Sequence, residues 1–382
     1  MNTDLRPRSG IRPLSRKRPR PRICTRARRW VGLSVVSACL VGVACETPED
    51  QRVVAARALL DSVMEANSIP GLSVAVGRGS QVMWSEGFGY SDLTHDVMVT
   101  PSTKFRVGSV SKPITAAAIG ILLEAGALDL DAPVQTYVPS FPAKRWPVTT
   151  RLLAGHLGGM RHYQGDENFS SVRYPTVLSG LAIFQEDPLI NEPGTEYSYS
   201  SYAWNLISAV IEGASGEAFL SYMDRVVFDP LGMDETVAGH TDSIIPNRTR
   251  FYVVSPAGQV LNAPYVDNSY KWAGGGFLST PEDLLRFANG HLEPGFLQAE
   301  TLEVLFTSQK TRDGTETGYG VGWSSGTNPR GERIVSHGGG SVGGRTMLTM
   351  NRDTGIIVAI VANLSSAPMT TELAGRIEEL FR

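Results

Sequence analysis

Residues 105–116 read FRVGSVSKPITA, a short strand-like run that leads into an apolar helix. Ser109 and Lys112 stand three positions apart, so on a helix they share a face with Cβ atoms roughly 5–6 Å apart. At the start of a helix, Ser109 would gain from the free backbone N–H groups and the positive end of the helix dipole. A buried Lys112 could take the proton of the Ser109 hydroxyl. Ser111 points elsewhere and is the weaker candidate. The spacing predicts Ser109 as nucleophile and Lys112 as its base, with a capped helix and a surface lysine as the alternative.

Two further segments carry groups that could serve the same chemistry. Residues 193–201 read PGTEYSYSS, and a tyrosine near a lysine ammonium would have a lowered pKa and could act as a general base. Residues 336–340 read SHGGG between two expected strands, where glycines allow close backbone approach and an N–H could complete an oxyanion hole. Tyrosines that pack an edge, and a glycine-rich strand bend, are the alternatives.

The remaining pattern predicts strands at both ends of the chain and helices between them. Expected helices cover 51–66, 109–125, 203–211 and 369–381, with Gly126 and Gly213 as stop signals, and expected strands cover 71–76, 81–90, 318–324, 332–336, 345–350 and 356–362. We therefore predict an α+β fold of two lobes, with a sheet lobe at about 56–108 and 316–382. A large helical lobe is expected at about 109–315.

The first 45 residues have the features of a targeting segment. An arginine-rich stretch precedes the apolar run 30–44, which is short for a membrane span, and Cys45 follows Gly-Val-Ala as in a bacterial lipoprotein cleavage site. We predict an exported lipoprotein acylated on Cys45, followed by a linker at 46–55. Cys39 is a second candidate, and the alternatives are mitochondrial import and an uncleaved anchor.

Composition excludes several classes of function. Residues 1–45 hold 11 of the 35 basic and 1 of the 38 acidic residues, so the rest carries 24 − 37 = −13, which argues against nucleic acid as partner. All three cysteines lie at or before Cys45, which excludes cysteine chemistry from the body. His156 and His162 lack zinc-site spacing, so we expect no metal and no cofactor.

Two glycine patterns match known motifs by letter only. Residues 339–343 (GGSVG) fit G-x-S-x-G, but a strand follows instead of a helix, and His337 is the last histidine. Residues 318–322 (GYGVG) lack the helix and acidic residue of a dinucleotide site. We assign neither a function.

Taken in order, S-x-x-K, a tyrosine motif after Pro-Gly and a His-x-Gly strand resemble the serine β-lactamase and penicillin-binding-protein superfamily. The resemblance covers about residues 52–382, and residues 160–163 (MRHY) and 264–280 (PYVDNSYKWAGGGFLST) are similar to its mitochondrial members. It implies the β-lactamase/transpeptidase-like fold, an antiparallel sheet built from both termini with the helical lobe inserted. It also implies these roles: Ser109 as acylated nucleophile, Lys112 as proton partner, Tyr199 as general base, His337 at the usual Lys of K-T-G, backbone N–H groups of Ser109 and Gly340 as oxyanion hole, and Gly339 and Ser201 as substrate-binding residues.

Three departures from the family pattern bear on the substrate. Ser201 replaces the Asn of Y-x-N, His337 replaces a lysine that supplies a fixed charge, and Gly158 stands where relatives often have serine. We therefore expect a serine hydrolase that cleaves amide or ester bonds of a small peptide or ester, rather than an efficient β-lactamase. The alternatives are a carboxylesterase, a weakly active binding protein that self-associates as a mitochondrial relative does, and a sensor that β-lactams acylate without turnover.

Overall fold

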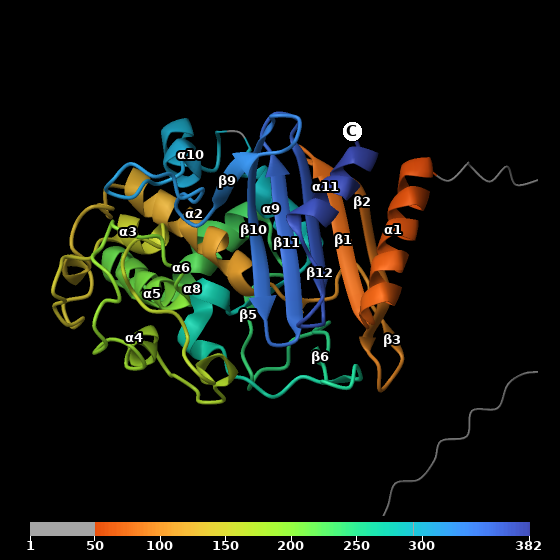
Figure 1. The fold of residues 1–382 in the computed structure, drawn as a ribbon, viewed down its shortest axis with the longest axis horizontal. Coiled ribbons are helices and arrows are strands. Elements are labelled where there is room, and N and C mark those ends of the chain that lie inside the picture. The colour runs from red at the N-terminus through yellow and green to blue at the C-terminus, as the bar shows by residue number, and fades with distance from the viewer. Residues whose placement is uncertain (1–49, 293) are drawn as a thin grey trace, which may run out of the picture. The chain divides into compact units, whose positions relative to one another are not determined.

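The sheet at the centre of the fold has seven strands, and each neighbouring pair is antiparallel (Figure 1). A computed structural model describes residues 50–292 and 294–382. The strands in spatial order are β3 (Val97–Met98), β2 (Gln81–Asp92), β1 (Gly71–Arg78), β12 (Ile356–Ala362), β11 (Gly344–Asn351), β10 (Arg333–Ser341) and β9 (Ser324–Thr327). Strands from both ends of the chain therefore meet where β1 pairs with β12, which confirms the predicted α+β fold.

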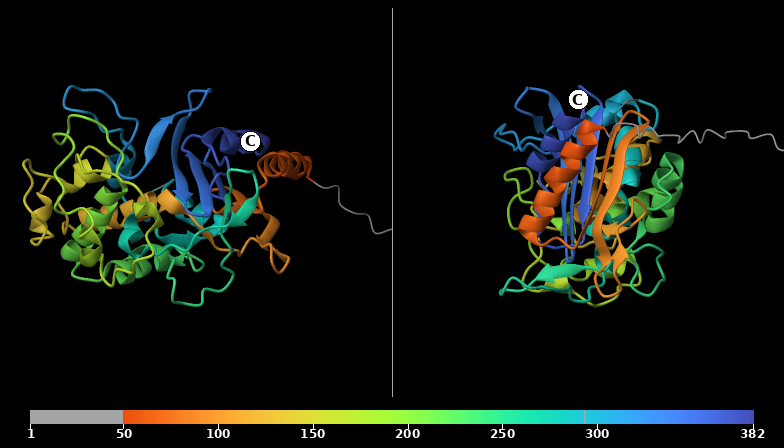
Figure 2. Two further views of the ribbon diagram at one scale, coloured as in Figure 1. Left: turned by 60° about the horizontal axis from the view of Figure 1, so that its bottom comes forward. Right: turned by 90° about the vertical axis from the view of Figure 1, so that its right-hand side faces the viewer.

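Helices cover both faces of this sheet. On one face lie the first helix α1 (Gln51–Asn67) and the last helix α11 (Thr371–Leu380), which share an apolar core with β1, β2 and β12 (Figure 2). The other face contacts α9 (Pro281–Asn289) and the helical lobe. All of β12 is buried, as expected for a strand of Val, Ile and Ala with helices on both sides.

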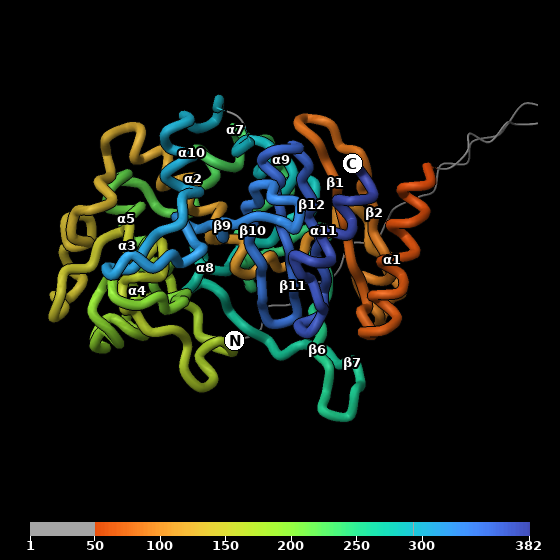
Figure 3. Tube along the Cα trace, turned by 45° about the horizontal axis from the view of Figure 1, so that its top comes forward, coloured from red at the N-terminus to blue at the C-terminus, as the bar shows by residue number. Residues whose placement is uncertain are grey.

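The helical lobe occupies the middle of the chain. Its helices are α2 (Ser111–Glu124), α3 (Thr150–Ala154), α4 (Val177–Leu181), α5 (Ser201–Ser215), α6 (Phe219–Met223), α7 (Asp229–Leu231), α8 (Trp272–Gly275) and α10 (Ala299–Phe306). A small sheet joins β4 (Phe105–Arg106), β8 (Phe277–Ser279) and β5 (Val237–Ala238). Figure 3 shows the hairpin of β6 (Tyr252–Val254) and β7 (Val260–Asn262) protruding beside the sheet.

Several predicted boundaries are wrong, and glycine geometry explains two of them. Gly213 does not end its helix, because the helix uses it for contact: a Cβ there would lie 1.9 Å from the Tyr137 carbonyl oxygen. The helix ends instead at Ser215, where the C-cap Gly216 has a φ of +72°. Residues 318–323 form no strand, because Gly318 and Gly322 have φ values of +69° and +81°, and β9 begins only at Ser324.

Two further differences lengthen elements at the ends of the chain. Helix α1 begins at Gln51 behind the N-cap Asp50, so residues 51–55 are helical and not part of a linker. Strand β10 continues to Ser341, so the glycine-rich residues lie within the strand and not after it. Within residues 50–292 and 294–382, no helix combines the length and apolar character needed to cross a bilayer. The predictions for Cys39 and Cys45 fall outside these residues.

Candidate active site

The turn that carries Ser109 is held against β10 by two glycines. Ser109 lies in a 3-10 turn, Gly108–Val110, directly before α2, and its side chain is half-buried. Gly108 has φ +52°, and a Cβ on it would lie 2.6 Å from the Gly340 carbonyl oxygen. A Cβ on Gly339 would lie 2.0 Å from the Val107 carbonyl oxygen. The absence of both side chains lets the backbone of β10 approach the serine turn, which brings Ser109, Gly339 and Gly340 together.

Lys112 is the second residue of α2, is completely buried and makes three polar contacts. Its Nζ lies 3.1 Å from Ser109 Oγ, 3.2 Å from Ser201 Oγ and 2.7 Å from the Gly274 carbonyl oxygen. The carbonyl only accepts, so the amine donates to it. A neutral amine has two N–H groups and one lone pair, which matches donation to Gly274 and Ser201 and acceptance of the Ser109 proton.

Burial weakens the basicity of this amine. Desolvation lowers the pKa of Lys112 well below its ordinary value, and the nearby charge of Lys271 lowers it further. No carboxylate pairs with Lys112 in the described part of the chain to offset this effect. The local geometry therefore gives the serine a base in its unprotonated form.

Tyr199 lies beside the lysine, but its titration differs from the prediction. Lys112 Nζ is 4.9 Å from the centre of the Tyr199 ring. The pKa of Tyr199 is raised by burial, which outweighs its hydrogen bonds to the hydroxyls of Ser109 and Ser201. The predicted lowering of the Tyr199 pKa is therefore wrong, because burial of the phenol is the dominant effect. Tyr199 is a protonated phenol that can donate.

Two histidines position the backbone that presents Tyr199 and Ser201. Nδ1 of His156 accepts from the Ser200 N–H at 3.2 Å, and Nδ1 of His162 accepts from the Ser201 N–H at 3.1 Å. The His156 and Tyr199 ring centres are 4.2 Å apart. Burial lowers the pKa of His162 to about 4 and that of His156 well below its ordinary value, so both acceptors stay unprotonated at neutral pH. Neither histidine was assigned a catalytic role from the sequence, although His162 lies in the stretch 160–163 that carries the family resemblance.

His337 is buried on β10 and hydrogen-bonded on both ring nitrogens. Nδ1 donates to the Gly338 carbonyl at 2.7 Å, so Nε2 accepts from the Tyr319 hydroxyl at 2.8 Å. Burial lowers the pKa of His337 to about 3. The ring is therefore neutral at physiological pH and does not replace the charge of a lysine. Tyr319 was missed, because its sequence context matched only the discarded glycine pattern.

The part of β10 next to Ser109 has a free edge. Strand β9 pairs only with Arg333–Ser336, while β11 pairs with β10 as far as Ser341. Residues 337–341 therefore have no strand partner on the β9 side within the described chain. Such an edge can offer backbone hydrogen bonds to a ligand. The G-x-S-x-G match at 339–343 lies in the β10–β11 hairpin, which is not a strand–turn–helix elbow.

A second lysine, Lys271, was not singled out from the sequence. It is buried in the short turn before α8, and its Nζ donates to Asn168 Oδ1 at 2.9 Å. The ring centres of Tyr163 and Tyr270 lie 5.2 and 5.1 Å from Nζ. Burial, with a smaller effect of Arg106, lowers its pKa to about 7. The site therefore has two buried amines without carboxylate partners in the described residues.

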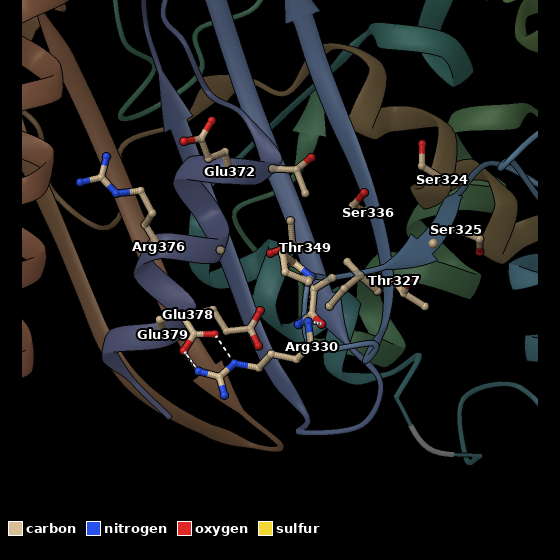
Figure 4. A pocket seen from close by; sticks show the side chains of 16 residues that line it. Ser324, Ser325, Thr327, Arg330, Ser336, Thr349, Glu372, Arg376, Glu378 and Glu379 are labelled. Carbon is tan, nitrogen blue, oxygen red and sulfur yellow. Dashed lines mark hydrogen bonds and ion pairs between the residues drawn. The ribbon is translucent and has the colours of Figure 1, made fainter.

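A large groove lies near the β9 edge of the sheet, on the face opposite the catalytic residues. It has a volume of about 570 Å³ and lies between β9–β11 and α11, with Ser336 and Thr349 on the sheet and Glu372 and Arg376 on the helix (Figure 4). Ser336 points into the groove, so its neighbour His337 points to the catalytic face. Among the described residues, no three His, Cys, Asp or Glu side chains cluster as metal ligands.

Comparison with known proteins agrees with this geometry. The model of the family described as Beta-lactamase matches residues 56–380. The human serine beta-lactamase-like protein LACTB, mitochondrial, is 32% identical over 422 residues, which cover 82% of this chain and 77% of the relative. Penicillin-binding protein 4* of Bacillus subtilis is 28% identical, covering 76% and 67%.

A solved structure extends the agreement to the fold. The octameric penicillin-binding protein homologue from Pyrococcus abyssi superposes with a TM-score of 0.75 at 26% identity, covering 86% of this chain and 77% of that one. With the S-x-x-K pair in contact and the family model spanning the body, the enzyme is a serine hydrolase that acts on amide or ester bonds through an acyl-enzyme. The chain belongs to the beta-lactamase family.

Proposed function

We propose that Ser109 attacks the carbonyl of an ester or peptide substrate while neutral Lys112 accepts the serine proton. The contact that carries this proposal is the 3.1 Å distance between Ser109 Oγ and the buried Lys112 Nζ. A desolvated amine is a competent base near neutral pH, whereas an ordinary lysine is protonated there. The half-buried position of Ser109 leaves its hydroxyl within reach of a substrate.

The remaining steps use groups around this pair. Backbone N–H groups of Ser109 and Gly340 stabilise the oxyanion of the tetrahedral intermediate. The leaving group departs with a proton that the Tyr199 phenol donates and Lys112 replenishes. Water then attacks the acyl-enzyme carbonyl while Lys112 accepts a proton from it. The bond between this carbonyl carbon and Ser109 Oγ breaks, the carboxylic acid product leaves, and Lys112 returns the proton to Ser109 Oγ. The raised pKa of Tyr199 keeps the phenol protonated, which is the form that can donate.

The substrate follows from the groups that replace the family's usual ones. His337 is neutral, and Ser201, which stands in place of an asparagine, contacts Lys112 at 3.2 Å. A β-lactam carboxylate would therefore find no fixed cation at position 337. We propose that esters or peptides without a carboxylate at the position facing residue 337 are turned over in preference to β-lactams.

Labelling with a fluorophosphonate probe tests the nucleophile. Wild-type residues 46–382 should be labelled on Ser109, and Ser109→Ala should lose the label completely, as read by mass spectrometry of the peptide. Ser111→Ala is the matched control, because Ser111 Oγ is buried and accepts the Phe277 N–H at 3.3 Å. Labelling that survives in Ser109→Ala would refute the assignment.

Lys271 should shape the pH dependence of the rate. Below about pH 7 Lys271 carries a charge that repels a proton from Lys112. Lys271→Met removes this charge, so the pKa of Lys112 should rise. The ascending limb of kcat/KM against pH should then move to higher pH, with a several-fold loss on the acid side. Lys271→Arg keeps the charge and should retain the wild-type limb, whereas an unmoved limb in both variants would contradict the coupling.

Self-association is the second function that an observation favours. The solved relative from Pyrococcus abyssi is described as octameric. We propose that this chain also forms homo-oligomers, which light scattering of wild type and Ser109→Ala would reveal. A monomeric protein would contradict the proposal of self-association. Stable acylation by penicillin without product release would instead favour the sensor hypothesis.

The destination of the protein is also a proposal. A lipid on Cys45 and attachment to the bacterial envelope follow from the leader sequence, whereas the human relative is described as mitochondrial. The mass of the mature N-terminus distinguishes the two: an acylated Cys45 supports export, and an unmodified cleavage product within the leader supports import.

A further inference from the structure

A pocket of about 570 Å³ lies beside the turn that joins β10 to β11, and its charged lining is exclusively basic. Its charged side chains are Arg106, Arg248 and Arg250, and its walls include Phe251 and Tyr265. The volume falls within the range of small-molecule sites. Tyr265 is 65% exposed, so an aromatic ring stands at the rim.

Arg106 is a buried guanidinium with no carboxylate partner in the described residues. Its Nη1 donates to the Val342 carbonyl at 2.7 Å, and its Cζ lies 3.9 Å from the centre of the Phe251 ring. A guanidinium has five N–H donors, so the carbonyl uses a small part of this capacity. An unpaired buried charge of this kind is costly unless a ligand compensates it.

The other charges leave the pocket positive. Arg248 is exposed, donates to the His240 carbonyl at 3.1 Å, and helps burial to lower the pKa of Arg106. Arg250 is partly neutralised by Asp92 at 3.3 Å. The nearby carboxylate of Asp267 is engaged by Thr241 and Ser269. Arg106 and Arg248 therefore repel each other, and an anion bound in the pocket would offset this repulsion.

The pocket is connected to the catalytic turn through Arg106. Arg106 precedes Ser109 by three residues, so their Cα atoms are at most about 11 Å apart. Its guanidinium also holds Val342, two residues after Gly340. A substrate acylated on Ser109 could therefore extend an acyl chain of a few carbons into the pocket.

We propose that this pocket binds an anionic group, a carboxylate or phosphate, at the far end of the substrate's acyl chain. The proposal rests on the proposed hydrolase function. Arginine forks suit such groups because they form paired, charge-assisted hydrogen bonds. The enzyme would then recognise an anion beside the β10–β11 turn, although His337 supplies no charge on β10.

Esters that differ only in terminal charge test the proposal. Mono-p-nitrophenyl esters of straight-chain dicarboxylic acids of increasing length are compared with their methyl-capped, neutral counterparts. At the matching length, wild type should show a KM about tenfold lower for the anionic ester. In Arg248→Gln this preference should disappear, so that kcat/KM is about the same for the anionic and the neutral ester. Arg376→Gln, an exposed arginine on α11 at the other groove, should keep the wild-type ratio.

Calorimetric titration of Ser109→Ala with inorganic phosphate separates the sources of the anion and does not depend on turnover. Phosphate binding that Arg248→Gln abolishes, together with the ester preference, supports the proposal. Arg248-dependent phosphate binding without any ester preference overturns the assignment to the substrate and leaves a site for a free anion. If phosphate does not bind and the anionic esters are not preferred, the proposed anion site is wrong. If no ester is cleaved, the hydrolase assignment fails, and the titration still tests the pocket.

Discussion

Lys112→Met is expected to lower kcat by about a thousandfold, the usual size of a general-base contribution. Methionine fills a similar volume without the amine, so Ser109 keeps its position but loses the group 3.1 Å from its hydroxyl. Ester hydrolysis and the rate of fluorophosphonate labelling measure the effect. Ser109→Ala defines the background rate. Near wild-type turnover in Lys112→Met would show that another group activates the serine.

The same substitution should change how stability depends on pH. The pKa of Lys112 is lower in the folded state than in the unfolded chain, so burying this amine costs stability at every pH below the unfolded pKa. The penalty is largest at low pH and disappears as the pH rises through the unfolded value, about 10.4. Lys112→Met lacks the penalty. Denaturant unfolding should therefore show the variant gaining most over wild type at low pH and losing that advantage above the unfolded pKa.

Gly339→Ala is expected to abolish labelling of Ser109 and to destabilise the fold by about 1–3 kcal/mol. The added Cβ would lie 2.0 Å from the Val107 carbonyl oxygen. That oxygen accepts the Val110 N–H and so closes the turn that carries Ser109. Since backbone on both sides must shift, the serine and the β10 edge would separate.

Gly338→Ala is the matched control one residue away. Its Cβ would meet only Met347 Cε, at 3.3 Å, the far end of a flexible side chain. Because alternate residues of a strand point to opposite faces, this methyl group points away from Ser109. The control should keep near wild-type labelling and stability. Equal losses in both variants would mean that any added side chain on β10 disrupts the strand, and the specific contact with Val107 would lose its support.

The sequence was sufficient for the features that depend on local spacing and order. The S-x-x-K interval placed Ser109 and Lys112 on one face of a helix start, and they are in contact. The α+β fold was predictable from strands near both ends of the chain and helices between them. Alternating and continuous apolar runs indicate which residues of these elements are buried. Boundaries were less predictable, because Gly213 looked like a stop signal until its contact with Tyr137 was known.

Protonation states were decided by tertiary structure alone. Whether Lys112 is charged depends on its complete burial and on Lys271, which lies 159 positions away in the chain. The neutrality of His337, the raised pKa of Tyr199 and the meeting of Arg106 with Arg248 arise in the same way. Desolvation and charge repulsion depend on distances in space, which no local pattern of residues contains. The sequence by itself determined which groups are available for catalysis, and the fold determined which of them carry a proton.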